Sequence, residues 1–383
     1  MELKTSIELL ESYIGKENYR GYDPYDALKS PLFKLPIFRN NRLVRFGTQQ
    51  FVKRSPLDLR QILFIPKGYN PVTLGLCIQA YAYLYQTDQY LKEKYYNKIE
   101  NLVEELKCLV SKGFSGACWG YDFDWEARHA KILAYQPTIV ATGIITNALY
   151  IANQITSLQQ CSDLVISAAQ FAMKDLNRTY KGDSFCFSYS PFDHQQVLNA
   201  SMKGARLLSQ AYALTGNETF KQEAKRVVDF VLSQQNEDGS WGYSLASGGG
   251  WIDNYHTGYV LDCLDEYRQL TQSPDVSGAL QKGYHFYRSH FITKEGIPRF
   301  YHNSTFPIDC TAAAQTILIL NRFEDILLAK VVAKWMSENM QAENGSFYFR
   351  KFKSYTIKTS FMRWSNAWMF MALTSLYSSL LKT

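Results

Sequence analysis

The chain has 383 residues, of which 46% are hydrophobic, 15% aromatic and 20% charged, with a formal net charge of +6. This composition supplies enough apolar surface for a large core and excludes a mainly disordered chain. The charge is modest for the length, so it suits an anionic sugar or glycan better than nucleic acid. We therefore expect no nucleic-acid partner.

The compartment is predicted from the cysteines and the N-terminal sequence. Seven cysteines occur singly without a CxxC pair, which favours buried thiols in a reducing compartment over a disulfide framework. The first residues contain acids and no apolar signal-peptide core, and no run of about 18 apolar residues predicts a transmembrane segment. We expect a cytoplasmic protein without a membrane span.

Helical stretches of two kinds alternate along the chain. Charged stretches with apolar residues at i, i+3, i+4 and i+7 occur at 90–113, 217–235 and 324–341. More apolar stretches with few charges lie between them, and in chain order they are 70–86, 137–153, 195–214, 253–267, 309–320 and 360–377. Period-2 strand patterns are short and isolated. The sequence therefore predicts an all-α protein.

Short aromatic segments mark an irregular internal repeat. They read CWGY at 118–121, CFSY at 186–189, SWGY at 240–243, PRFY at 298–301 and SFYF at 346–349. About six pairs of helices, each with one apolar member, bury that member best in an inner ring. We predict a single domain, 1–383, that forms an (α/α)6 toroid with a central cavity. Residues 3–15 would supply an outer helix, and residues 1–70 would be partly irregular. A linear solenoid, whose repeats are usually shorter and more regular, is the competing arrangement.

One of these turns resembles a known motif. QQNEDGSWGY contains Gln235, Gly239 and Trp241 with the spacing of the QW motif of squalene and terpene cyclases, and QAENGSF at 341–347 is a degenerate copy. The resemblance implies a toroid in which the motif ties the end of an outer helix to the next turn. It carries a structural message and no catalytic one.

Polar and aromatic residues gather just before the apolar helices, where the loops of a toroid meet at one end of the cavity. These loops span 119–138, 188–199, 250–258, 299–315 and 358–368. Aromatic rings beside carboxylates suit sugar binding, and glycosidic chemistry needs a pair of carboxyl groups, one of them protonated. We predict Asp253 and Asp124 as the acid and base, with His256 as the alternative base and Asp309 as a further catalytic candidate. The predicted substrate-binding residues are Trp119, Tyr121, Asp122, Arg128, Trp251, Asn254, Tyr255, Arg363 and Trp364.

Structural roles compete with these assignments. Asp253 and Asp309 can serve as N-caps, because a carboxylate accepts hydrogen bonds from the first turn of a helix. His256 can be a satisfied core histidine, and the tryptophans can simply pack. Basic, aromatic-rich stretches at 33–54 and 349–364 favour an anionic ligand but can also be solvated faces.

Other chemistries fit the residues less well. The triglycine at 248–250 lacks the spacing and the lysine of a phosphate loop. Asp309, Cys310 and His256 or His302 supply zinc-ligand types, but adjacent Asp and Cys are not the expected spacing, so we predict no metal and no cofactor. FPIDCTAAAQ resembles the acid motif of protonating terpene cyclases at Asp309, whereas Pro307 and Cys310 replace its partners, which argues against cyclase activity.

Four stretches resemble the VpsJ-like bacterial polysaccharide biosynthesis proteins. They are WGYDFDWEAR, WIDNYHTGYVLDCL, IDCTAAAQ and RWSNAWMFMAL, spread over residues 119–373. The resemblance implies a cytoplasmic role in capsule or exopolysaccharide synthesis, in company with the synthesis machinery, and assigns no reaction. Hydrolase, lyase and epimerase chemistry stay open, as do a non-catalytic glycan-binding or scaffold subunit and an isoprenoid-binding toroid.

Overall fold

The structure, a computed structural model, describes residues 2–126 and 131–382. Its inner helices follow the predicted apolar stretches: α4 Pro71–Thr87, α6 Ile139–Thr156, α8 Leu198–Thr215, α10 Asn254–Thr271, α12 Cys310–Arg322 and α14 Trp368–Leu380. The outer helices are α1 Leu3–Lys16, α5 Lys92–Cys108, α7 Gln159–Lys174, α9 Glu218–Leu232, α11 Ser277–His290 and α13 Ile326–Asn339. The predicted alternation of inner and outer helices is confirmed.

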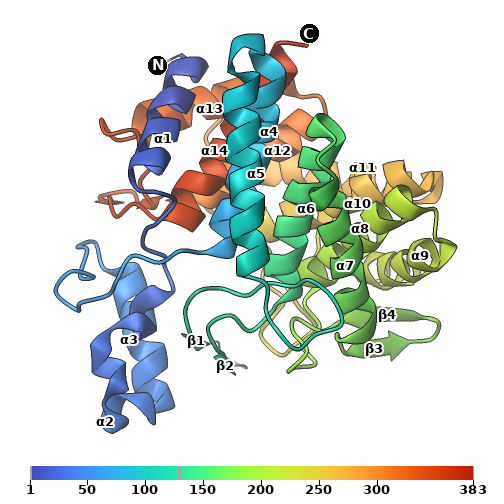
Figure 1. Ribbon diagram of the computed structural model, residues 1–383, viewed down its shortest axis with the longest axis horizontal. Coiled ribbons are helices and arrows are strands. Elements are labelled where there is room, and N and C mark those ends of the chain that lie inside the picture. The colour runs from blue at the N-terminus through green and yellow to red at the C-terminus, as the bar shows by residue number, and fades with distance from the viewer. Residues whose placement is uncertain (1, 127–130, 383) are drawn as a thin grey trace.

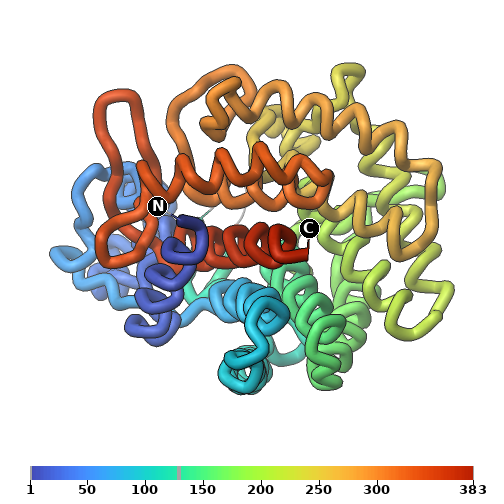
Figure 2. Tube along the Cα trace, turned by 90° about the horizontal axis from the view of Figure 1, so that it is seen from above, coloured from blue at the N-terminus to red at the C-terminus, as the bar shows by residue number. Residues whose placement is uncertain are grey.

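The inner helices form a closed ring. Each packs against the next in chain order, and α14 packs against α4, which excludes the linear solenoid. Figure 2 shows the chain colours passing round the molecule until the red C-terminal segment lies beside the blue helix α1. Helix α1 contacts both α13 and α14, so the predicted helix at 3–15 is the sixth outer helix.

Side-chain chemistry explains why the inner helices begin where they do and why they pack closely. Asn70, Thr138, Asp253 and Asp309 cap α4, α6, α10 and α12 by accepting hydrogen bonds from first-turn amides. A Cβ atom at Gly143 would lie 2.8 Å from the Cβ of Lys203, so glycine permits the close approach of α6 and α8.

The QW-like motifs tie neighbouring outer helices together, as the resemblance implies. Gln235 donates to the carbonyl of Gly239 and to that of Ala279 in α11, the next outer helix. Gln341 donates in the same way to Gly345 and to Ser6 in α1. The degenerate copy therefore performs the same task at the place where the two ends of the chain meet.

Short elements gather at the end of the ring where the inner helices begin. They are β1 Trp125–Glu126, β2 Lys131–Ile132, β3 Arg178–Lys181, β4 Ser184–Phe187 and a three-stranded sheet of β5 Ile308–Asp309, β6 Arg350–Lys351 and β7 Thr356–Ile357. A helical lobe with α2 Pro36–Arg39 and α3 Arg42–Arg54 projects beside this end (Figure 1). The region expected to be partly irregular thus contains an outer helix and this lobe.

Helix α6 is the one helix among the described residues that is long and apolar enough to cross a bilayer. It belongs to the inner ring, and 72% of its residues are buried against the other helices. Its apolar character is therefore explained by its place in the core.

Candidate functional site

A cavity of about 580 Å³ opens where the inner helices begin, and we call it the mouth cavity. Its wall includes residues from all five polar loops picked out by sequence and, from the lobe, residues of α3. The loop around Gly248 and Gly249 forms part of the wall. The predicted convergence of loops on one cavity is thus present.

His256 and Asp253 form a hydrogen-bonded pair in the wall of this cavity. The Nδ1 atom of His256 lies 2.7 Å from Oδ2 of Asp253, and the backbone amide of His256 donates to Oδ1 at 3.1 Å. Trp251 donates its indole N–H to the same carboxylate at 3.0 Å. Asp253 is only 2% exposed, whereas the His256 side chain is 19% exposed. The carboxylate therefore fixes the imidazole, and Nε2 is left as its second nitrogen.

Of the two roles that the sequence allowed for Asp253, N-cap and acid/base carboxyl, the structure shows the N-cap. It is the N-cap of α10, and it orients the imidazole one turn into the helix. A carboxylate that accepts from Nδ1–H selects the tautomer whose Nε2 lone pair is free, which is the form a general base needs. The arrangement therefore leaves Nε2 of His256 able to accept a proton while Asp253 holds Nδ1.

Aromatic rings form much of the remaining wall. Trp251 stacks on Tyr243 with ring centroids 4.4 Å apart, and it is 43% exposed at the opening. Tyr255 packs against His256 at 4.2 Å and meets Trp364 edge-on at 5.5 Å. Such faces pack against the C–H surfaces of a sugar ring while their polar edges accept or donate hydrogen bonds. Trp251 is the ring best placed to act as a platform.

Two arginines of the wall are held by buried carboxylates. Arg363 donates through Nε and Nη2 to Asp23 at 2.7 and 2.9 Å, and Arg350 donates to Asp309 at 2.6 Å. Burial opposes the charge of Arg363, but the Asp23 carboxylate outweighs it and raises the pKa of the guanidinium. Both cations therefore stay charged in the wall, although each already has an anionic partner.

Lys53, in α3, forms a hydrogen bond with the phenol group of Tyr25. Its Nζ lies 2.5 Å from the Tyr25 hydroxyl and 4.0 Å from the centre of the Tyr25 ring. Burial, followed by the nearby charge of Arg350, lowers the pKa of Lys53 to about 7. Burial also raises the pKa of Tyr25 to about 12. The pair can thus hold or release a proton near neutral pH through the lysine.

The remaining predicted residues have structural positions outside the mouth cavity. Asp124 accepts from the backbone amide of Ala134 at 2.8 Å, and Asp309 caps α12 while it binds Arg350. Asp122 binds Lys29 at 2.9 Å and Asn70 at 2.8 Å, which ties the loop before α6 to the segment before α4.

Two predicted sugar-binding residues need correction. Trp119 is 0% exposed and donates to the carbonyl of Leu106, just as Trp241 donates to Val231 at the end of another outer helix. Asn254 is likewise buried, and it bonds to Arg299, Thr316 and Tyr287. Neither side chain reaches the cavity. Arg128 lies outside the described residues, and Tyr121, Tyr255, Arg363 and Trp364 do line the cavity as expected.

Several residues of the cavity wall were not predicted individually from the sequence. Lys53 and Arg350 lie in the two basic stretches that were noted only as whole segments. Tyr189, Tyr243 and Tyr259 lie in segments that were noted for their repeat or family resemblance and not as site residues, and Tyr25 lies in no motif. The likeness of CWGY to SWGY was the one signal that could have placed Trp119 in the core beside Trp241. Sequence spacing alone does not tell which face of a turn meets the cavity.

The carboxylates of the wall are already engaged. Among the described residues these are Asp253 and Glu126, and Glu126 binds Arg45 at 2.8 Å and Arg42 at 3.3 Å. The described residues of the wall therefore do not include a pair of carboxyl groups of which one is free to protonate a leaving group. The described residues also contain no cluster of three or more metal-ligating side chains.

The fold belongs to the class of six-hairpin α/α toroids, in which many carbohydrate-active enzymes are built. No protein-family model matches the sequence, and no curated protein sequence matches it. The similarity is therefore one of fold, found among solved structures.

Three of these structures show its extent. A cellobiose 2-epimerase from Bacillus thermoamylovorans matches with a TM-score of 0.62 and 11% identity, over 80% of this chain and 87% of its own. A GH76 α-mannanase from Bacteroides thetaiotaomicron matches with 0.59 and 11%, over 82% and 87%. A mutant of unsaturated glucuronyl hydrolase from Streptococcus agalactiae matches with 0.55 and 12%, over 98% and 90%.

Proposed function

We propose that this protein is a sugar epimerase or isomerase, which moves a proton at the carbon beside the carbonyl group of its substrate. The observation that carries the proposal is the imidazole of His256, held by Asp253 so that Nε2 is the free base. The neighbours that are epimerases and isomerases use the same fold, which supports the proposal without deciding it.

The steps follow from the groups in the wall. His256 removes the proton from the carbon next to the carbonyl, and the electron pair of that C–H bond moves toward the carbonyl oxygen to give an enediolate. The charges of Arg350 and Arg363 stabilise the negative charge that develops. Return of a proton to the other face of the same carbon gives an epimer, and return to the former carbonyl carbon gives an isomer.

Lys53, with Tyr25 beside it, is the group we assign to the returning proton. The amine of Lys53 is close to half protonated at neutral pH because its pKa is about 7. This value is near the optimum for proton transfer. His256 and Lys53 come from α10 and α3, so the ring and the lobe each supply one proton-transfer group.

A second candidate function is β-elimination from an anionic glycan. Lys53 and Arg54 in the wall at the lobe favour a ligand with negative charge, and the solved neighbours also include a polysaccharide lyase. A lyase would use a base such as His256 and a cation that holds the uronate group.

One experiment separates these reactions. Aldoses and uronic-acid oligosaccharides are incubated with the protein in D₂O, and the products are followed by proton NMR and ultraviolet absorbance. An epimerase or isomerase exchanges the proton beside the carbonyl for deuterium, a lyase forms an absorbing double bond, and a hydrolase releases new reducing ends. Loss of exchange in His256→Gln ties the reaction to the site. No turnover of any substrate would leave the scaffold function in its place.

The wider biological role is also a proposal. The four motifs that resemble polysaccharide biosynthesis proteins support a cytoplasmic function in making capsule or exopolysaccharide, with the synthesis machinery as partner. The test is to delete the gene and complement it with the His256→Gln variant. An enzyme of this pathway should restore surface polysaccharide only in its wild-type form, whereas a scaffold should restore it in both.

A further inference from the structure

A second cavity lies in the ring, toward the end where the inner helices finish, and we call it the far cavity. It has a volume of about 310 Å³ and is lined by residues from all six inner helices, with Ser379 and Lys382 among its lining residues. This volume is at the lower end of the range of about 300–1,000 Å³ that is usual for ligand sites.

The two cavities are distinct but share a partition. Ile144, Tyr259 and Trp368 line both of them, so these side chains separate the mouth cavity from the far cavity. The Lys203 ammonium lies 3.8 Å from the centre of the Tyr259 ring on the far side, and burial lowers its pKa to about 8. The far cavity does not contain His256 or Asp253.

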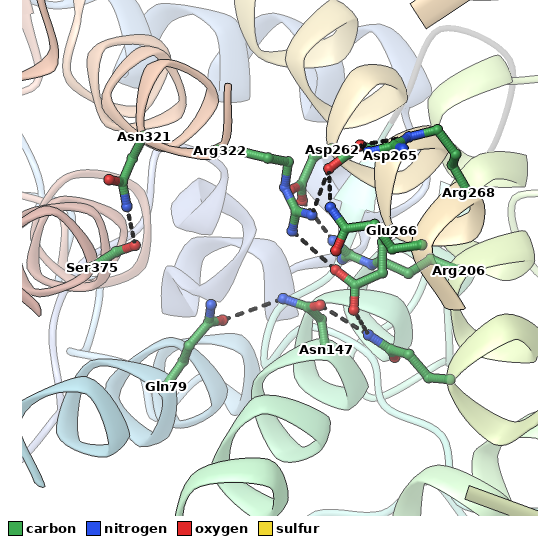
Figure 3. A network of polar contacts seen from close by, with 12 residues as sticks. Gln79, Asn147, Arg206, Asp262, Asp265, Glu266, Arg268, Asn321, Arg322 and Ser375 are labelled. Atoms are coloured by element: carbon green, nitrogen blue, oxygen red, sulfur yellow. Dashed lines mark hydrogen bonds and ion pairs between the residues drawn. The ribbon is translucent and has the colours of Figure 1, made fainter. Parts of the chain in front are cut away.

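The acidic side chains and the arginines around the far cavity neutralise one another. Arg322 binds Asp262 at 2.6 Å, Asp265 at 3.2 Å and Glu266 at 2.9 Å. Arg206 binds the other oxygen of Asp262 at 2.6 Å. Figure 3 shows these groups meeting from different helices. The carboxylates and guanidinium groups are thus paired among themselves, and the lysines Lys203, held against the Tyr259 ring, and Lys382 remain as cations of the wall.

Neutral polar side chains occupy other parts of the wall. Asn147 donates to Gln79, and Asn321 donates to Ser375 at 3.0 Å (Figure 3). Amides and hydroxyls each provide both donors and acceptors, so they match the hydroxyl groups of a sugar. The set is unusual for the core of a ring, where apolar contacts would be more stabilising.

Several of these buried polar groups have a hydrogen-bonding atom without a partner within the described chain. They are Nε2 of Gln315, Nε of Arg206 and Oδ1 of Asn321, all of which belong to residues that line the far cavity. Gln315 is 1% exposed and Arg206 is 2% exposed. A buried hydrogen-bonding atom without a partner destabilises the folded protein, so a ligand that satisfies these atoms recovers the lost free energy.

We propose that the far cavity is a second ligand site, which binds a neutral polyhydroxylated molecule such as a monosaccharide. The unpartnered atoms include two donors and one acceptor, which fits hydroxyl groups better than an anion or a hydrocarbon. The proposal does not depend on the reaction in the mouth cavity, because none of its carrying residues belongs to that site.

The test is titration with the methyl glycosides of glucose, mannose, galactose and N-acetylglucosamine. Methyl glycosides have no free carbonyl, so a reaction of the kind proposed for the mouth cavity does not consume them. Binding is measured by calorimetry and by saturation-transfer NMR on the wild type, His256→Gln, Gln315→Met and the control Gln222→Met, which alters an exposed glutamine of α9. We expect His256→Gln and Gln222→Met to keep a binding site that Gln315→Met weakens at least tenfold.

A second variant guards against a folding defect in the core. Ser379→Phe changes a half-buried lining residue near the end of α14 and leaves the polar network intact. It should block binding while circular dichroism and thermal unfolding stay as in the wild type. The proposal is overturned if no glycoside binds the wild type at millimolar concentration, if binding is lost in His256→Gln, or if Gln315→Met and Ser379→Phe both bind normally.

Discussion

Replacement of Asp253 by Asn tests whether the carboxylate orients the imidazole of His256. Asn is as good an N-cap as Asp, so α10 should still begin at the same residue. The Asn side chain, however, has one oxygen and one N–H₂ group where Asp has two accepting oxygens. The N–H₂ group must face either the indole N–H of Trp251 and Nδ1 of His256, or the first-turn amide of α10. The first choice keeps the cap but makes His256 accept at Nδ1, which puts the proton on Nε2, where the base is needed.

The size of the effect can be worked out from these contacts. Loss of the orienting carboxylate in a serine-protease triad, by the same tautomer change, costs about 10⁴-fold in kcat. We expect kcat/KM for proton exchange to fall by about 10³–10⁴-fold in Asp253→Asn. The N–H of Trp251 would lose its acceptor, but because this side chain is 43% exposed water can take the place of the carboxylate, and the free energy of unfolding should change little.

The assay is deuterium exchange into the substrate by NMR, with urea unfolding measured on the same samples. Asn217→Ala is the matched control, because Asn217 caps the outer helix α9 at the surface. It should lose about 1 kcal/mol of stability and keep full activity. If Asp253→Asn retains activity within tenfold of the wild type while it folds normally, His256 does not depend on this carboxylate and the reasoning is refuted.

Three further predictions concern single residues. Because Lys53 has a pKa of about 7 and is assigned as proton donor, kcat should fall as the pH rises through 7, and Lys53→Met should remove that limb of the pH–rate profile. The same depressed pKa means that the unfolded chain binds more protons between pH 7 and 10.5, so wild-type stability should rise with pH there and any stabilisation by Lys53→Met should be largest below pH 7. Trp251→Ala should raise KM about tenfold, equivalent to about 1.4 kcal/mol, with kcat little changed in steady-state kinetics; an unchanged KM would show that the ring is not a sugar platform. Trp119→Phe removes the hydrogen bond to Leu106, so it should lower the free energy of unfolding by about 1–3 kcal/mol and leave KM unaltered, whereas a large change in KM would restore the role predicted from sequence.

The fold was accessible from the sequence because periodicity and burial are properties of continuous segments. The lack of charge in stretches such as 139–156 follows from burial of the whole helix in the ring, and the glutamines of the QW-like motifs bind as the spacing suggests. Closure of the ring required no further information, since the amphipathic helix at the N-terminus needed a partner for its apolar face.

The site was predicted less fully because its wall is built by residues that are distant in sequence. Asp253 and His256 are three residues apart on one helix, so a local pattern found them. Lys53 meets Tyr25 through the fold of the lobe, and Arg350 meets Asp309 through pairing of β5 with β6. No local pattern reports such contacts. Asp124 and Trp119 lie in a loop that does reach the cavity, but their side chains bond to the protein backbone. Asp124 accepts from the amide of Ala134, and Trp119 donates to the carbonyl of Leu106.

The place of α1 affects how the chain is made in the cell. Its buried residues Ile7, Leu10 and Ile14 are synthesised long before its neighbours α13 and α14. The distance from Lys16 to Ile326 is 310 residues, which take about 15–60 s at roughly 5–20 residues per second. An apolar helical face is thus without its partners during this interval, which makes it a natural binding segment for chaperones that guard nascent chains.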